Sequence, residues 1–490
     1  EAPGLLADRD DPGSLVTEVA PPELEAWEDR VDGRMRRKMR ALRRLFEDCE
    51  GPAPRVRLGD GRIPAPVTTA LAGGGTLIAH SPPSGQPRSG AGATPREEHL
   101  TATGETSQGP GHPRDLDVYG RRGLTLVRGE GAVVWDENGR SYIDCIGGHG
   151  ALALGHRHPA LTAALQAQAE RLWYAPGAFQ NPARTAFLEA LHQRIPPVLA
   201  RTFLSNSGTE AVEAALKFAR LHTGRSGLVA AEGGFHGRTM GSLSVTAERR
   251  YRDPFEPLVP GVRRVPFNDA EALAEAVDDS TAGVILEPVQ GESGVHPASK
   301  AFLQAARGAC DESGALLILD EVQTGFGRTG TLFAFQRSGI VPDILCLAKS
   351  VAGGLPLGAT VLRQGIEVSP GAHGSTFGGN PIACAVGRAV LQVLDEPGFL
   401  DSVDEKGTRL ADRIRKSGSP QVKEVRQVGL MIGIQVRTRA RPFVEALQER
   451  GILALTAGTR VIRLLPPLII SDSQLGQVEE ALLDVLANGS

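Results

Sequence analysis

Two residues of opposite charge each follow a short apolar run and precede a glycine-rich loop. Asp320 ends the run LILD, and Lys349 directly follows the run ILCLA. Runs of this kind are typical of strands buried on both faces of a parallel sheet. Because such sheets bind ligands at the carboxyl ends of their strands, we expect Asp320 and Lys349 to face one site. Glu287 ends a similar run, VILE, and belongs to the same expected edge.

A lysine near an acid has two interpretations, a structural ion pair or a site for carbonyl chemistry. Pyridoxal phosphate chemistry needs a lysine for the Schiff base, an acid that keeps the pyridine nitrogen protonated, and an anion cradle. Ser207, Gly208 and Thr209 stand where a loop becomes a helix, so free N–H groups and a hydroxyl can meet a phosphate there. These residue types also cap ordinary helices, so the cradle counts only together with Lys349 and Asp320.

Strand-like and helix-like patterns alternate along the chain after Tyr119. Residues 124–144 are typical of two or three short strands joined by turns. Helical spacing occurs in residues 183–195, 211–224 and 301–314. Short apolar runs occupy residues 282–288, 315–320 and 344–348. This alternation predicts an α/β fold with a mostly parallel sheet.

Length, charge and cysteine usage exclude several classes of protein. The 490 residues are enough for about two to four domains, and the net charge of −4 provides no broad basic field for nucleic acid or anionic membranes. No apolar run approaches the roughly 18 residues of a membrane span, and the opening residues do not resemble a signal peptide. The five cysteines are scattered, which favours a reducing compartment. We expect a cytoplasmic protein that binds neither nucleic acid nor membrane.

The composition changes near residue 113. Residues 51–113 are dense in Gly, Pro, Ser and Thr and have no period, so we predict a disordered or loosely attached segment. Residues 21–50 have a helix-forming composition with acidic residues ahead of a basic cluster. That segment is interpreted as a solvated charged helix or, alternatively, as an arm that binds a partner.

Seven motifs occur in a fixed order through the rest of the chain. They are NSGTEA, GGFHGRTMGSLS, LEPVQGE, LILDEVQTGFGRTG, PDILCLAKSVAGGLPLG, STFGGNP and RLLPPL. Together they resemble the class III, or ω-amino, aminotransferases of pyridoxal-phosphate fold type I, over about residues 115–488. Within the class the chain most resembles the acetylornithine aminotransferases and their lysine-biosynthetic relatives, whose substrates are attached to a small acidic amino-group carrier protein.

The resemblance implies a large domain with a mostly parallel central sheet and a smaller α+β domain built from both chain ends. We therefore divide the chain into an N-terminal extension that is largely disordered and can contain a helix (1–113), the first part of the small domain (114–170), the large cofactor-binding domain (171–390) and the C-terminal small domain (391–490).

The resemblance also implies how pyridoxal 5'-phosphate would be held along its ring. Lys349 would form the Schiff base and later shuttle a proton, and Asp320 would bond the pyridinium nitrogen. Gln323 would hydrogen-bond the phenolic oxygen of the ring. Phe235 would stack on the ring face, although an aromatic residue can equally fill a core.

The phosphate would be shared between two subunits. By the same resemblance, Gly208 and Thr209 would hold it from one subunit and Thr376 from the neighbouring subunit. A homodimer with shared active sites follows from that arrangement.

Substrate contacts are implied at four further positions. Arg238 resembles the anchor for the carboxylate far from the reacting carbon, and Ser375 would lie close to substrate. Arg463 would receive the α-carboxylate of glutamate or 2-oxoglutarate. An ω-amine donor leaves that arginine without an anion, so Glu292 would mask it. Taken singly, each of these charges could belong to a surface ion pair.

Two histidine features are assigned differently. His156 and His158 lack further ligands at metal spacing, so we expect no metal site. His149 departs from the family, several members of which place an aromatic residue near the substrate at this position. The preference for the substrate side chain is therefore open.

The predicted function is transfer of the terminal amino group between an N-acylated diamino acid and 2-oxoglutarate or glutamate, in arginine or lysine biosynthesis. The acylated donor would be acetylornithine, or lysine or ornithine linked to a carrier protein. Candidates for a positive rim that guides the acidic carrier are Arg249, Arg250, Arg252, Arg263 and Arg264, which could also be ordinary solvated arginines. The alternatives are ornithine or 4-aminobutyrate aminotransferase, and a catalytically idle subunit that binds pyridoxal phosphate.

Overall fold

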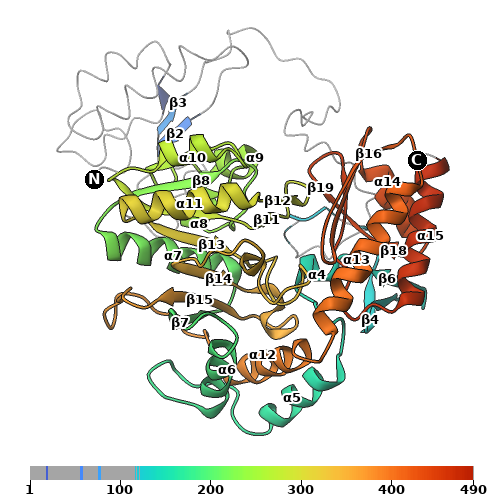
Figure 1. The fold of residues 1–490 in the computed structure, drawn as a ribbon, viewed down its shortest axis with the longest axis horizontal. Helices are drawn as coiled ribbons and strands as arrows, with labels where there is room; N and C mark the ends of the chain where they lie inside the picture. The colour runs from blue at the N-terminus through green and yellow to red at the C-terminus, as the bar shows by residue number, and fades with distance from the viewer. Residues whose placement is uncertain are drawn as a thin grey trace. The chain divides into compact units, whose positions relative to one another are not determined.

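The computed structural model describes residues 116, 118–120 and 122–488, and the backbone of three short strands nearer the N-terminus (Figure 1). Those strands are β1 (Glu18–Val19), β2 (Val56–Leu58) and β3 (Thr76–Ile78), paired in the order β1-β3-β2. They lie in a first unit, residues 1–103, and the remaining residues form a second unit. The patterns in residues 51–113 did not predict β2 and β3. The helix predicted over 21–50 lies outside the described residues.

A seven-stranded sheet forms the centre of the second unit, in the order β7-β15-β14-β13-β10-β8-β9. Its strands are β7 (Leu199–Ser205), β8 (Gly227–Ala231), β9 (Val262–Val265), β10 (Thr281–Leu286), β13 (Leu316–Asp320), β14 (Ile344–Leu347) and β15 (Gly358–Arg363). The strands from β14 to β9 run parallel to one another, and β15 runs antiparallel to both of its neighbours. The predicted α/β fold with a mostly parallel sheet is confirmed.

Helices cover both faces of this sheet, which explains the continuous apolar runs. In β13, Leu316 and Ile318 pack with the buried face of α7 (Gly208–Thr223), whereas Leu317 and Leu319 pack in the cluster that contains α11 (Lys300–Ser313). Since successive side chains of a strand point to opposite faces, neither face of β13 meets water. Full burial of each such leucine stabilises the fold by roughly 1.5–3 kcal/mol. Figure 1 shows α11 and α10 (Ala270–Ala276) over the sheet.

Three further helices pack together beside the sheet: α5 (Pro159–Ala169), α6 (Pro182–His192) and α12 (Pro381–Leu394). Asparagine caps start two of them. The side chains of Asn181 and Asn380 accept hydrogen bonds from the backbone N–H groups of Arg184 and Ala383, and a proline follows each cap. Proline fits the first helical turn because its missing N–H would have no partner there. Local sequence therefore fixes where α6 and α12 begin.

A smaller part of the second unit combines segments that precede the large sheet in the sequence with segments that follow it. β4 (Leu126–Glu130), β5 (Val133–Asp136) and β6 (Ser141–Asp144) form a sheet with β18 (Ile452–Leu453), which runs parallel to β6. A second sheet contains β16 (Val422–Val428), β17 (Met431–Val436), β19 (Leu455–Ala457) and β20 (Val461–Leu464). Strands from distant parts of the chain thus form one layer, as expected. The predicted boundaries at residues 113, 170 and 390 stay predictions.

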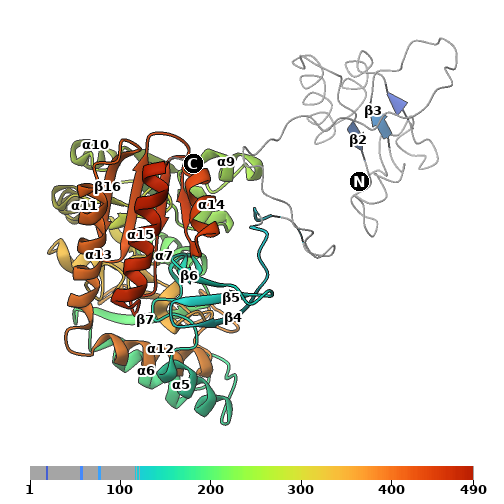
Figure 2. The same ribbon diagram turned by 90° about the vertical axis from the view of Figure 1, so that its right-hand side faces the viewer.

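Three helices accompany these smaller sheets: α13 (Phe399–Lys416), α14 (Arg441–Glu449) and α15 (Asp472–Asn488). Figure 2 shows α15 close to the other two, and it packs against both. Among the helices of the described residues, none is long and apolar enough to cross a membrane.

Candidate active site

Asp320 and Lys349 lie at neighbouring strand ends, as their positions in the sequence predicted. Asp320 is the last residue of β13 and pairs in register with Cys346 of β14. Lys349 begins the short helix η4 (Lys349–Ala352) after one further residue beyond β14. The parallel strands bring both side chains to the same edge of the sheet.

Lys349 has an unusual backbone and an environment that favours its neutral form. Its φ of 47° is in the left-handed region, which few residues other than glycine adopt. Burial lowers the pKa of its ammonium group, although the nearby carboxylate of Glu292 acts in the opposite direction. Within the described residues, no hydrogen bond or ion pair involves the amine. A neutral amine is the nucleophilic form, so Lys349 is suited to attack a carbonyl.

Asp320 is held by His236, a contact that the sequence did not predict. Asp320 is 4% exposed, and its Oδ2 lies 2.7 Å from His236 Nδ1. Asp320 Oδ1 also accepts a hydrogen bond from the backbone N–H of Val322 at 3.0 Å. Burial by itself lowers the pKa of His236, but the hydrogen bond to Asp320 and its charge outweigh burial, so the pKa is raised. The contact with His236 therefore fixes the position of Asp320 at the end of β13.

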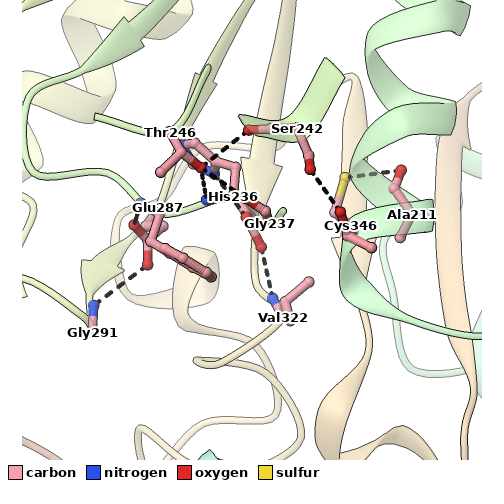
Figure 3. A network of polar contacts seen from close by, with 12 residues as sticks. Ala211, His236, Gly237, Ser242, Thr246, Glu287, Gly291, Val322 and Cys346 are labelled. Carbon is pink, nitrogen blue, oxygen red and sulfur yellow. Dashed lines mark hydrogen bonds and ion pairs between the residues drawn. The ribbon is translucent and has the colours of Figure 1, made fainter. Parts of the chain in front are cut away.

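Glu287 completes this cluster from the end of β10 (Figure 3). Its carboxylate accepts hydrogen bonds from the backbone N–H groups of Phe235 at 2.9 Å and Gly291 at 3.4 Å. Burial raises its pKa to about 7, and the positive charge of His236 opposes that shift. We call Asp320, His236 and Glu287 the buried acid cluster. The motif around His236 was visible in the sequence, but 84 residues separate it from Asp320.

A chain of hydroxyl groups connects the buried acid cluster to Thr209. The backbone N–H of His236 donates to Thr246 Oγ1 at 2.9 Å, and Thr246 Oγ1 donates to the carbonyl oxygen of Ser242 at 3.0 Å (Figure 3). Ser242 Oγ lies 2.6 Å from Thr209 Oγ1. Thr209 also accepts a hydrogen bond from the backbone N–H of Thr239 at 3.2 Å. This network connects Thr209, at the start of α7, through His236 with Asp320, at the end of β13.

The start of α7 lies where the sequence analysis expects an anion cradle. Ser207 caps the helix by accepting a hydrogen bond from the backbone N–H of Glu210, and Gly208 and Thr209 form the first helical positions. N–H groups at these positions have no acceptor inside the helix and carry the positive end of its dipole. A Cβ atom at Gly208 would lie 2.6 Å from Val322 Cγ1, so the close approach of the chain requires glycine there.

Arg463 and Glu292 form an ion pair close to Lys349. Arg463, on β20, is 1% exposed, and its Nη1 donates to Glu292 Oε1 at 2.7 Å. The side chain of Glu292 is 32% exposed. Burial raises the pKa of Glu292, but the charges of Arg463 and Lys349 outweigh burial and lower it to about 2. We call Glu292 and Arg463 the gate pair.

Gln323 follows β13 in the chain and contacts the gate pair. Its Nε2 donates to Glu292 Oε1 at 3.4 Å. Its Oε1 is buried, and no group among the described residues hydrogen-bonds it. Because a buried amide atom without a partner is costly, this position calls for a ligand atom.

Arg238 and Phe235 surround an aromatic ring that the sequence analysis missed. The guanidinium carbon of Arg238 lies 3.4 Å from the ring centroid of Tyr251 and 5.6 Å from that of Phe235. Phe235 and Tyr251 meet edge to face, with centroids 6.1 Å apart. Tyr251 belongs to the short helix α9 (Arg249–Arg252), outside the motif that contains Arg238 and Phe235.

Ser375 and Thr376 have different surroundings. Ser375 Oγ accepts hydrogen bonds from Asn206 Nδ2 at 3.2 Å and from the backbone N–H of Gly378 at 3.0 Å, so it adjoins the loop before α7. Thr376 is exposed and does not join the contacts made by Thr209.

Two histidines noted in the sequence, His149 and His156, have different surroundings. His149 has a φ of 56°, and its pKa is lowered by burial and by the nearby charges of Arg463 and Lys349, against the effect of Glu292. His156 Nε2 lies 3.0 Å from Asp144 Oδ2. Within the part of the chain that the structure describes, no three His, Cys, Asp or Glu side chains are arranged to hold a metal ion.

Comparison with known proteins assigns the family. The family described as aminotransferase class III matches residues 119–486. The chain belongs to the class III aminotransferases. As a member of that family it is a pyridoxal-phosphate-dependent transaminase.

Curated relatives of this class III aminotransferase match most of their own length. The [LysW]-aminoadipate semialdehyde transaminase of Deinococcus radiodurans is 46% identical over 379 residues, which cover 76% of this chain and 88% of that protein. The acetylornithine aminotransferase of Methanopyrus kandleri is 46% identical over 375 residues, which cover 76% of this chain and 96% of that protein.

Solved structures agree with the fold. An ornithine aminotransferase from Toxoplasma gondii, described with partial occupancy of pyridoxal phosphate at its active site, is 34% identical, with a TM-score of 0.72 over 74% of this chain and 90% of that one. An acetylornithine aminotransferase from Elizabethkingia anophelis is 31% identical, with a TM-score of 0.68 over 77% of this chain and 97% of that one. The class III aminotransferase therefore has the pyridoxal-phosphate fold type I.

Features of the site fit this cofactor. The free N–H groups at the start of α7 suit its phosphate, and the buried acid cluster suits a protonated ring nitrogen. The unpartnered amide atom of Gln323 suits a polar ring substituent, because the oxygen and nitrogen of an amide can exchange places to meet either a donor or an acceptor.

Proposed function

We propose that this transaminase moves the terminal amino group of an N-acylated diamino acid to 2-oxoglutarate, giving a semialdehyde and glutamate, with the biosynthetic flux in the reverse direction. The names of its relatives support this substrate class, since they act on [LysW]-aminoadipate semialdehyde or acetylornithine. One observation about the site carries the proposal: a buried arginine beside Lys349 is paired with a carboxylate that remains partly exposed.

The gate pair suits an enzyme that must accept two kinds of amine. Glutamate brings an α-carboxylate to the reacting carbon, and Arg463 can bind it once Glu292 moves away. An ω-amine donor brings only a CH2–NH2 end, which would leave the buried Arg463 without a counter-charge. Glu292 then restores the charge balance. A single enzyme can thereby run both half-reactions in one pocket.

We assign cofactor contacts to residues of the described site. Lys349 would bind the cofactor aldehyde and carry a proton to and from the reacting carbon, because its pKa is lowered. Asp320 would bond the ring nitrogen, Gln323 the phenolic oxygen, and Phe235 would stack on the ring. Gly208 and Thr209 would hold the phosphate. When bound, pyridoxal phosphate supplies an aldehyde for amine exchange and a protonated ring that accepts electrons.

We propose a homodimer in which Thr376 contacts the phosphate in the neighbouring subunit and Ser375 lies near substrate. Large aromatic side chains near this segment support an interface, since Trp173, Phe179 and Phe377 are each more than 60% exposed (69%, 66% and 63%). Light scattering should give twice the mass of one chain. A monomer that turns over at the normal rate would contradict shared active sites.

The acyl group is either acetyl or a carrier protein. If it is a carrier protein, the contacts of the candidate rim arginines indicate which of them could bind it. Arg263 binds Thr281 Oγ1 at 2.6 Å and is paired with Asp278. Arg264 donates to the carbonyl oxygen of Thr246 at 3.3 Å. Arg249 and Arg250 of α9 also meet carboxylates, those of Asp253 and Glu248, but their side chains are 81% and 66% exposed, which makes them the stronger rim candidates.

The salt dependence of kcat/KM distinguishes a carrier-linked donor from an acetylated donor. A carrier-linked donor should have a higher kcat/KM than the acetylated donor at low salt, and the advantage should shrink as salt rises, because salt screens the attraction of an acidic carrier. Equal efficiency with both donors at low salt would exclude the carrier branch.

A panel of amine donors tests the main proposal. Purified protein with 2-oxoglutarate should use N-acetylornithine or a carrier-linked donor with higher kcat/KM than ornithine or 4-aminobutyrate. A preference for either free amine would favour the corresponding aminotransferase. Absence of the cofactor's visible absorbance in protein saturated with pyridoxal phosphate would favour an idle subunit.

We also propose the cytoplasm as the compartment. The described cysteines, Cys145, Cys310, Cys346 and Cys384, are free and buried. Burial raises the pKa values of their thiols, which makes them poorly reactive. Cell fractionation followed by immunodetection tests the assignment, and recovery outside the soluble fraction would contradict it.

A further inference from the structure

The guanidinium group of Arg238 lies against an aromatic face instead of an acid. Its guanidinium carbon is 3.4 Å from the ring centroid of Tyr251. The side chain is exposed, and its backbone N–H donates to Thr209 Oγ1 at 3.3 Å. Among the described residues, no carboxylate forms an ion pair with this guanidinium. The cation is therefore ordered without being neutralised.

Stacking of this kind leaves the recognition edge of an arginine free. A guanidinium that lies on a ring uses its flat face, whereas its N–H donors point outward in the plane. A free arginine side chain loses roughly 2 kcal/mol of conformational freedom when a ligand orders it. An arginine that is already held on a ring avoids much of this loss. Such an arrangement favours bidentate binding of a carboxylate.

Tyr251 is itself fixed by its neighbours. Its hydroxyl oxygen accepts a hydrogen bond from Arg250 Nη2 at 2.9 Å, and its backbone N–H donates to the carbonyl oxygen of Glu248 at 3.1 Å. Its ring also meets Phe235 edge to face. These contacts tie the ring on α9 to the residue that we assign to the cofactor ring face. The position of Arg238 is thereby linked to that of the cofactor.

We propose that Tyr251 is a positioning residue that orients Arg238 for the substrate carboxylate farthest from the reacting amine. The inference rests on the proposed role of Arg238 and deepens it. Tyr251 makes the enzyme selective for substrates with such a carboxylate, and it does so through Arg238 without touching the reacting atoms. An amine of the same length without the carboxylate gains nothing from this ring.

Matched substrate pairs isolate this role. N-Acetylornithine and N-acetylputrescine differ only in the carboxylate, as do glutamate and norvaline except for the replacement of that carboxylate by a methyl group. Single-turnover rates of each half-reaction, measured against concentration in the holoenzyme, give an apparent Kd for every amine. The variants are Tyr251→Leu, which removes the aromatic face, and Tyr251→Phe, which keeps it. Phe255→Leu is the control, because Phe255 is an exposed aromatic residue outside the site.

Tyr251→Leu should weaken binding of N-acetylornithine and glutamate by about 10-fold, within the range of cation–π energies, and change the other two amines by less than about 2-fold. Tyr251→Phe should restore most of the lost affinity, and Phe255→Leu should change none of the four. Equal losses for both members of a pair would overturn the inference, as would a phenylalanine variant as impaired as the leucine variant. If the leucine variant does not fold, Tyr251→Met provides the same comparison.

The two proposals fail in different ways. If the wild-type protein does not react with N-acetylornithine or a carrier-linked donor, the proposed substrate is wrong. The comparison of glutamate with norvaline still tests the role of Tyr251 in that case.

Discussion

The two charged parts of the site differ in how firmly they are held. In the buried acid cluster, each group is buried, and Asp320 has both a histidine and a backbone N–H as partners. In the gate pair, Arg463 is buried but Glu292 is 32% exposed and reaches it through one hydrogen bond. The first arrangement permits one geometry. The second permits an exchange of anions.

This difference matches the demands of transamination. A ring nitrogen keeps the same partner through both half-reactions, so its partner gains from rigidity. In the proposed function Arg463 meets two different amines, so it would release one anion and accept another, and its partner must be able to leave. A buried charge without a partner is costly, so the buried Arg463 needs a new anion when the pair opens, whereas Glu292 already has contact with water and is the residue that can move.

Lys349→Ala should cause the largest loss. Only a primary amine at this position can bond the cofactor aldehyde and carry the proton, so turnover should fall by about four orders of magnitude or more. Cofactor can still bind without a covalent bond, which is measured by its absorbance after dialysis. Normal turnover by this variant would contradict the chemistry that we assign to Lys349.

Asp320→Asn should be the next most damaging change. It leaves the buried His236 without a full counter-charge, and loss of one member of a buried pair costs roughly 3–5 kcal/mol. We expect kcat to fall about 100- to 1000-fold with both amine donors, measured by steady-state kinetics. Asp278→Asn, at an exposed acid paired with Arg263, is the matched control and should have normal kcat.

Glu292→Gln should separate the two half-reactions. The reaction with the ω-amine donor should slow by about 10-fold, because the neutral side chain no longer compensates Arg463, whereas the reaction with glutamate should persist or accelerate. Stopped-flow measurement of each half-reaction decides the matter. Glu130→Gln, which alters an exposed glutamate paired with Arg128, should affect neither. Equal losses in both directions would show that the gate pair is a fixed structural contact.

The last prediction concerns how the free energy of unfolding depends on pH. The pKa of Glu287 is raised from 4.5 to about 7 in the folded chain, so its contribution to stability is complete below about pH 4.5 and is lost as pH rises through 7. Relative to Glu287→Gln, the wild type should therefore lose about 3 kcal/mol of its free energy of unfolding over that range. Urea unfolding at several pH values measures it.

Glu292 provides the opposite case. Its pKa is lowered to about 2, so its contribution is present above about pH 4.5 and is lost as pH falls toward 2.

A wild-type protein that instead gained stability relative to Glu287→Gln between pH 4.5 and 7 would show that Glu287 is ionised in the fold.

The sequence predicted residues whose positions follow from strand ends and helix starts. Asp320 and Lys349 end apolar runs, and Gly208 and Thr209 begin a helix, so local patterns were sufficient to expect them at one edge. The assignment of Gln323 rested on the motif around Asp320. Roles assigned to these residues remain predictions.

Contacts between separate elements could not be predicted in the same way. His236 had no partner in the sequence until the fold brought β13 beside it, and nothing local marks Tyr251 as the neighbour of Arg238. The sequence alone could not distinguish the five rim arginines from one another. The structure separates them by exposure, because the side chains of Arg249 and Arg250 are 81% and 66% exposed and that of Arg263 is 37% exposed.

The backbone of Lys349 implies a conflict between durability and turnover. A residue with a Cβ atom in the left-handed region, as at φ 47°, costs about 1–2 kcal/mol, whereas glycine does not have this cost. Selection for thermal resistance alone would therefore favour glycine at this position, and the resulting protein would outlast the natural one in heat while catalysing nothing. The chemistry that we propose for its amine accounts for a lysine at this strained position.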